Sequence, residues 1–273
     1  MKKTVYILAI ILLLLVFGVS AFMVGSYLIE SKQQKDQFDE LAAMKENVKN
    51  PTEATGEKPV PTEETLPEGT FGAEEIRDEN GILLQYSEQY ALNNDMVGWI
   101  QIEGTDLNYP VMQTPGRTDY YLKRDFYGNQ SVRGCIYARE ECDILEPSDN
   151  ITIYGHNMRD GSMFAALNDY VYKETWEKNP FIFFDTLYDY HVYKIFAVFR
   201  TSANLGEGFP YHNMIEADNK EDFDDFISTC KNLSMEYYDT GLTPQYGDKI
   251  ICLSTCEYTL PNGRFVVAAV RIS

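Results

Sequence analysis

Lys249-Ile-Ile-Cys-Leu-Ser-Thr-Cys256 is an apolar run with the composition of a buried β-strand, and it ends at a cysteine. A second strand-like run begins at Arg264. If residues 257–263 form the turn between the two runs, the strands pair antiparallel and bring a thiol and a guanidinium to the same end of one sheet. The sequence therefore predicts a β-hairpin with Cys256 beside a permanent cation.

Strand-like segments also make up most of the chain between residue 97 and this hairpin. They are rich in β-branched and aromatic residues and are separated by turn residues. The predicted strands are Val97–Ile102, Asn108–Met112, Gly134–Ala138, Asn150–Tyr154, Phe181–Phe184, Tyr190–Arg200, Lys249–Ser254 and Phe265–Ile272. A mainly β fold follows, and periodicity alone fits a closed barrel and a sandwich equally well.

Helical patterns interrupt or precede these strands. Ala73–Leu92 predicts one or two short amphipathic helices that Gly81 interrupts. Ser162 has the chemistry of an N-cap for a helix over residues 163–170. Asp222–Cys230 predicts another helix, with three apolar residues on one face.

The N-terminal segment is long and apolar. Residues 4–29 contain no charged side chain, and 26 residues at ~1.5 Å rise can cross a hydrocarbon core of ~30 Å. Lys2 and Lys3 precede it, so the positive-inside bias predicts a cytoplasmic N-terminus and an exported remainder. A cleaved signal peptide is the alternative, because Val19-Ser20-Ala21 resembles a cleavage site. The apolar run continues to Ile29, which favours the anchor.

Composition divides the chain into three parts. Residues 1–30 are the predicted cytoplasmic N-terminus and transmembrane anchor, residues 31–70 an extracellular linker, and residues 71–273 the folded domain. The linker is rich in Glu, Lys, Thr and Pro, so it buries too little apolar surface to offset its ordering entropy. Its first part, Ser31–Val48, has helical character that Asn50-Pro51 ends.

Charge and cysteine content narrow the function. A formal net charge of -19 and a pI near 4.5 argue against a nucleic-acid partner. The five cysteines leave at least one thiol outside intramolecular disulfides. Cys135 and Cys142 could close a small loop, whereas Cys252 and Cys256 lie roughly 13 Å apart along one strand, too far to bridge. No C-x-x-C pair is present, which argues against a zinc site.

Three residues have the chemistry of acyl transfer. Cys256 is the candidate nucleophile, because nearby cations favour the thiolate that attacks. His156 follows a strand and a glycine in Ile151-Thr-Ile-Tyr-Gly-His-Asn-Met158, where a loop can aim an acid-base group over a sheet edge. Arg264 can donate two hydrogen bonds to a substrate carbonyl or to an oxyanion.

These residues resemble the Cys-His-Arg centre of sortases, and the flanking sequence is similar to class B, the sortase B family. Leu253-Ser-Thr-Cys256 resembles the family's Thr-Leu-x-Thr-Cys signature, with Cys252 in place of the usual threonine. One departure is Thr118, which stands near an expected asparagine. Other landmarks are Asn94–Ile100, Tyr109–Gln113, Tyr121-Leu122, Ser148–Met158 and Asn262–Val267.

The resemblance implies a closed eight-stranded sortase-type β-barrel with N-terminal helices and a few helices in the connections. It implies a membrane-anchored transpeptidase that cleaves a C-terminal sorting signal after Thr through a Cys256 thioester and joins the protein to a peptidoglycan amine. Arg264 would stabilise the oxyanion, and His156 would move protons. Ser254 and Thr255 are candidates for the substrate groove. The chemistry requires no metal or organic cofactor.

Two other functions remain open at this point. A cysteine peptidase would hydrolyse the same thioester with water. A membrane-tethered binding module would carry Cys256, His156 and Arg264 as structural residues. Thiol reactivity separates the second alternative from an enzyme, because a structural Cys256 would label no faster than Cys252.

Overall fold

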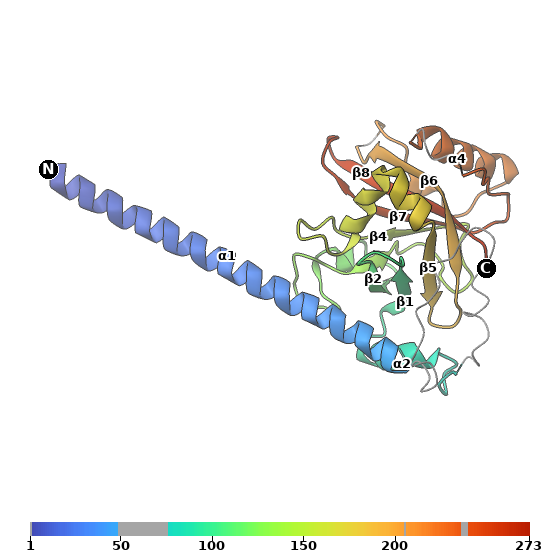
Figure 1. The fold of residues 1–273 in the computed structure, drawn as a ribbon, viewed down its shortest axis with the longest axis horizontal. Coiled ribbons are helices and arrows are strands. Elements are labelled where there is room, and N and C mark those ends of the chain that lie inside the picture. Colours follow the sequence, from blue (N-terminus) through green and yellow to red (C-terminus); the bar gives the residue numbers. More distant parts are fainter. Residues whose placement is uncertain (1, 49–75, 205, 236–239) are drawn as a thin grey trace. The chain divides into compact units, whose positions relative to one another are not determined.

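The computed structural model describes residues 2–48, 76–204, 206–235 and 240–273 (Figure 1). The chain forms two compact units, residues 1–41 and 42–273. Of the predicted linker, residues 49–70 lie outside the described residues. The predicted start of the catalytic domain, residues 71–75, lies outside them as well.

One long helix, α1 (Lys2–Asn47), contains the apolar N-terminal segment. It is long and apolar enough to cross a membrane, a test of length and composition that a signal sequence also passes. The large apolar side chains described between Tyr6 and Ile29 are exposed. The predicted helical continuation over Ser31–Val48 is confirmed as far as Asn47.

The second unit contains a closed eight-stranded barrel, as predicted. All neighbouring strands pair antiparallel except β2 with β3 and β4 with β7, which pair parallel. Around the barrel the order is β1 (Met96–Gln101), β2 (Asn108–Met112), β3 (Ile136–Ala138), β4 (Asn150–Tyr154), β7 (Ile250–Glu257), β8 (Gly263–Arg271), β6 (Val192–Ser202) and β5 (Phe181–Thr186), which closes on β1.

Each predicted strand is present, with ends shifted by a few residues. The largest difference concerns β7, which continues past Ser254 through Glu257 and so contains Cys256 within the ladder. β8 begins at Gly263, one residue before Arg264. Both functional side chains therefore lie on paired strands, whose backbone is held more firmly than a loop.

The helices agree with prediction in two places and differ in one. Helix α2 (Leu84–Leu92) follows a turn in which Gly81 has a φ of 79°. Helix α4 (Lys220–Leu233) is capped by the side chain of Asn219, the residue before it. The remaining helices are η1 (Tyr120–Lys123), η2 (Phe164–Val171), α3 (Lys173–Lys178) and η3 (Tyr211–Asn213).

The prediction that Ser162 caps an α-helix over residues 163–170 is wrong. The segment is the 3₁₀ helix η2, and Met163, the residue before it, has a φ of 59° and makes no side-chain capping bond. The Ser162 hydroxyl instead bonds to the side chains of Asp160 and Arg133. The Ser162 hydroxyl is therefore bonded to these side chains and does not cap the helix, although its local propensity predicts a cap.

An apolar layer separates α4 from the sheet. The α4 side chains Phe223, Phe226 and Cys230 pack over the faces of β6, β7 and β8 that carry Phe199, Cys252 and Val266. Because alternate residues of a strand point to one side, Cys252, Ser254 and Cys256 share this face of β7. The thiol of Cys256 therefore lies on the same face of β7 as the side chains packed under α4, near the C-terminal end of the strand.

Candidate active site

The hairpin of β7 and β8 brings the candidate nucleophile and cation together. The Cα atoms of Cys256 and Arg264 are directly paired in the antiparallel ladder. Directly opposed residues have Cβ atoms ~4.5–5.5 Å apart and point to the same face. Both residues are half-buried, so they are held by the sheet and still reachable from solvent.

The turn between them is braced by a carboxylate. Glu257, next to the thiol, accepts hydrogen bonds from the amides of Thr259 (2.8 Å) and Leu260 (3.1 Å). Its Oε1 also lies 3.6 Å from the Nε of Arg200. Burial by itself would raise the pKa of Glu257, but these hydrogen bonds and the Arg200 charge lower it. The Glu257 carboxylate is therefore ionised at neutral pH and holds the turn through these hydrogen bonds.

The Arg264 guanidinium is tied to the same turn through one nitrogen. Its Nη1 donates to the carbonyl of Gly263 (3.0 Å) and to the carbonyl and side-chain oxygens of Asn262 (both 3.3 Å). Asn262 has a φ of 49°, a left-handed conformation that asparagine tolerates better than most residues. This local geometry limits where the cation can lie.

The parallel pairing of β4 and β7 places His156 level with Cys256. Tyr154 pairs with Ser254, and the Gly155 amide donates to the Ser254 carbonyl (3.1 Å). One residue past His156, Asn157 donates its side-chain amide to the Cys256 carbonyl (2.9 Å). The loop after β4 therefore stays attached to β7 on both sides of His156.

A backbone carbonyl orients the imidazole. The Nε2 of His156 lies 2.8 Å from the Leu122 carbonyl, which can only accept, so Nε2 carries the proton and Nδ1 can accept another. Gly134 makes room for this carbonyl: it has a φ of 59°, and a Cβ there would lie 2.5 Å from the Leu122 oxygen. The Tyr121-Leu122 motif was recognised in the sequence, but the sequence could not predict that the Leu122 backbone carbonyl bonds to His156.

The two hydroxyl residues before Cys256 are buried, with 1% and 2% of Ser254 and Thr255 exposed. The Ser254 hydroxyl lies 2.6 Å from that of Tyr211, and Thr255 donates to the Gly155 carbonyl (2.7 Å). Both hydroxyls thus have internal partners that brace the strands around Cys256. Their assignment to the substrate groove stays a prediction.

The other four cysteines are buried free thiols, so Cys135 and Cys142 form no disulfide. Burial raises the pKa of each of these four thiols, which keeps them protonated and unreactive. Among the residues that the structure describes, no three His, Cys, Asp or Glu side chains form a group that could hold a metal ion.

An ion pair holds the loop that follows His156. The side chain of Arg133 is 3% exposed and bonds to Asp160 and Ser162. At the base of the loop, the Phe164 amide donates to the His156 carbonyl (2.9 Å). Partial burial alone would raise the pKa of Asp160, but the hydrogen bonds from Arg133 and Ser162 outweigh it and lower the pKa to about 2.

Replacing Asp160 by asparagine is expected to make stability less dependent on acid pH. The folded-state pKa of Asp160 is depressed, so its stabilisation is complete above ~4 and is lost as pH falls towards 2. At pH 7 the Asp160→Asn variant should be less stable by about 1 kcal/mol, because solvent screens a side chain that is 46% exposed. Urea unfolding at several pH values measures the difference.

The difference should shrink between pH 4 and pH 2. Asp169→Asn is the matched control, since Asp169 is exposed and its substitution should change stability by less than ~0.5 kcal/mol. A gap between wild type and Asp160→Asn that stays constant down to pH 2 would contradict the assigned role of this carboxylate.

Comparisons with known proteins agree with this geometry. The model of the sortase domain family matches residues 100–272. Sortase B of Staphylococcus aureus is 33% identical over 190 residues, covering 68% of this chain and 73% of the relative. Sortase B of Listeria monocytogenes is 31% identical over 257 residues, covering 92% and 90%. The structure of a Staphylococcus aureus sortase B–substrate complex superposes with a TM-score of 0.71 at 26% identity, covering 90% of this chain and 99% of that chain.

The matched region includes the hairpin that carries Cys256 and Arg264, and the loop that carries His156. The eight-stranded barrel is the fold of the solved relative. The resemblance inferred from the sequence is therefore confirmed at the level of family, class and fold. The chain belongs to the sortase family, as a sortase B-type cysteine transpeptidase.

Proposed function

We propose that this protein is anchored in the cell membrane by α1 and joins secreted proteins to the cell wall. In this proposal it cleaves a C-terminal sorting signal after Thr and transfers the new carboxyl end to an amine of the peptidoglycan precursor. The observation that carries the proposal is the convergence of three elements: Cys256 pairs with Arg264 across the hairpin, and the His156 loop bonds to the Cys256 carbonyl.

The first half of the reaction forms an acyl-enzyme. Nδ1 of His156 takes the proton of the Cys256 thiol, and the resulting thiolate attacks the threonine carbonyl carbon, whose oxygen becomes negative in a tetrahedral intermediate. Arg264 stabilises that oxygen by hydrogen bonding and charge. The C–N bond then breaks, His156 gives a proton to the departing amine, and the threonine remains bound to sulfur as a thioester.

The second half resolves the thioester. The incoming amine attacks the thioester carbonyl, and His156 takes up the proton that the amine loses. Collapse of the second tetrahedral intermediate forms the new amide and releases the Cys256 thiolate. The hydrogen bond from His156 Nε2 to Leu122 supports this cycle, because it keeps the ring oriented while Nδ1 exchanges the proton.

The proposed location has the N-terminus in the cytoplasm and the catalytic domain outside. Lys2 and Lys3 before the apolar segment support this orientation. Anchoring would confine the enzyme to the surface where sorted proteins and a lipid-linked precursor are also held. Fractionation of cells tests it: an anchored enzyme stays with the membrane, whereas cleavage after Ala21 would release it.

Hydrolysis is the competing fate of the thioester, because water could replace the amine. The decisive experiment is mass spectrometry of the products formed from a library of sorting peptides of the Thr-Gly and Thr-Asn types, with and without an added amine. An amide-linked product supports transfer, and a free threonine carboxylate as the sole product in saturating amine would support a peptidase. The Staphylococcus aureus relative was solved with a substrate, which supports peptide recognition by this family member.

Arg264→Lys is expected to lower kcat/KM for the sorting peptide by ~10²-fold or more. Lysine keeps the charge but is a point donor without the planar fork that spans two oxygens. Arg271→Lys is the matched control at the other end of β8, and it should keep kcat/KM within ~3-fold. Wild-type kinetics in Arg264→Lys would place the guanidinium outside the reaction.

A further inference from the structure

A buried asparagine at the start of β4 bonds to a segment of the connection between β6 and α4. Asn150 is fully buried, and its Nδ2 donates to the carbonyls of Tyr211 (3.0 Å) and Met214 (2.8 Å). Its backbone amide donates to the Ile215 carbonyl (3.0 Å). One residue therefore holds three main-chain carbonyls of this segment, which we define as residues 211–217.

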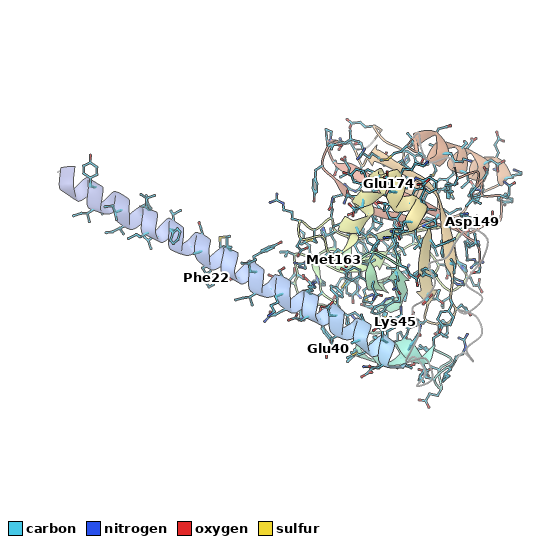
Figure 2. All side chains as sticks on the ribbon, viewed as in Figure 1. Phe22, Glu40, Lys45, Asp149, Met163 and Glu174 are labelled. Atoms are coloured by element: carbon cyan, nitrogen blue, oxygen red, sulfur yellow. The ribbon has the colours of Figure 1, made fainter. Side chains whose placement is uncertain are left out.

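Asp149 fastens the other end of segment 211–217. Its Oδ2 accepts from the Ala217 amide (3.1 Å), while its Oδ1 pairs with the Lys249 ammonium (2.8 Å) at the start of β7. Asp149 stands just before β4, and Met163 stands after the loop that carries His156. Both residues are labelled in Figure 2, where they lie well apart. The Asp-Asn pair thus acts at the end of β4 opposite to His156.

The beginning of segment 211–217 reaches the strand of the nucleophile. The Tyr211 hydroxyl lies 2.6 Å from that of Ser254, which is two residues before Cys256 and on the same face of β7. Burial raises the pKa of Tyr211 to about 12, so the phenol stays protonated and can keep this bond at neutral pH. Tyr211 also packs into the apolar layer beside Cys252.

Segment 211–217 has little regular structure of its own to hold it. Its only helical part among the described residues is the three-residue turn η3, Tyr211–Asn213. Without the Asn150 side-chain amide, the Tyr211 and Met214 carbonyls would lose these partners, and an unpaired buried carbonyl is costly. Asn150 therefore holds the middle of the segment, between the Tyr211–Ser254 contact at one end and the Asp149–Ala217 bond at the other.

We propose that Asn150 is a positioning residue for peptide binding: it holds segment 211–217 as the wall of the path along which a peptide reaches Cys256. This inference rests on the proposed function. Only an amide side chain of this length offers two donors to two carbonyls, and an aspartate would place negative oxygens against them. Asp149 and Asn150 belong to the Ser148–Met158 motif, and in this proposal they act on residues 211–217 and not directly on Cys256.

The test compares wild type with Asn150→Asp and Asn150→Ala, using the peptide that wild type converts fastest. The KM is expected to rise at least 10-fold while kcat changes less than ~3-fold. Hydrogen exchange at residues 211–217 should accelerate. Alkylation of Cys256 by iodoacetamide, which needs no peptide path, should stay within ~2-fold of wild type. Asn168→Asp is the matched control, because its amide bonds only locally to the Ala165 carbonyl (2.9 Å).

Several results would overturn the proposal. These are an unchanged KM in a folded Asn150 variant, a loss confined to kcat, or an equal slowing of iodoacetamide alkylation. Should Asn150→Asp fail to fold, Asn150→Ala decides alone. Peptide affinity is also measured by titration in the Cys256→Ala background with and without Asn150→Ala. If wild type processed no peptide, the proposed function would be wrong. The role of Asn150 would still be tested by the change in peptide affinity in the Cys256→Ala background and by hydrogen exchange at residues 211–217.

Discussion

Replacing Cys256 by alanine is expected to abolish both cleavage and transfer while leaving the fold intact. In the proposed mechanism the Cys256 sulfur forms the acyl-enzyme, so its removal should lower the turnover rate by ~10⁴-fold or more. Peptide cleavage followed by chromatography measures the rate. Intact-protein mass spectrometry should detect the threonyl thioester on wild type and no adduct on the variant.

Cys252→Ala is the matched control for this prediction. Cys252 shares the face of β7 with Cys256 but is fully buried in the apolar layer under α4. Removing its sulfur should cost about 1 kcal/mol of stability and leave turnover within ~3-fold. Normal turnover by Cys256→Ala, or equal alkylation rates of Cys252 and Cys256 in wild type, would favour the binding-module alternative.

Substituting His156 by glutamine is expected to have the next largest effect. Glutamine offers an amide that can replace the donor to the Leu122 carbonyl, but it cannot carry a proton. Both the departure of the amine and the attack of the acceptor need that proton transfer. The rates of acylation and deacylation should therefore each fall by ~10²–10⁴-fold. Single-turnover mass spectrometry separates the two rates.

His191→Gln is the matched control. His191 is half-buried, and it directly precedes β6. Its kinetics should stay within ~3-fold of wild type. If His156→Gln slowed only peptide binding, with normal single-turnover rates at saturation, His156 would have a structural role and another group would carry the proton.

Sequence pattern and tertiary structure contributed different parts of this description. The eight strands follow from local composition, because β-branched and aromatic residues suit a pleated, half-buried surface. The pairing of Cys256 with Arg264 also follows, since a short turn between adjacent strands leaves few alternatives. The choice of a barrel over a sandwich came from family resemblance, because strand periodicity is the same in both.

Local reasoning failed where distant groups compete for a side chain. Ser162 has good capping chemistry, yet its hydroxyl is taken by Arg133 and Asp160. Likewise, the hydroxyls of Ser254 and Thr255 bond to Tyr211 and to Gly155, which are distant in sequence. Apart from Asp160, which is two residues from Ser162, these partners lie about 30 to 100 positions away along the chain, beyond the reach of any periodicity.

By itself the sequence determined the strands, the hairpin and the apolar N-terminal segment, because these depend on neighbours in the chain, and its motifs indicated the three candidate reactive side chains. Only the tertiary structure decided that the Leu122 carbonyl orients His156 and that Asn150 holds segment 211–217. Both are contacts to backbone carbonyls, which every residue possesses. Their partners become visible only when the barrel closes and brings distant segments within hydrogen-bonding distance.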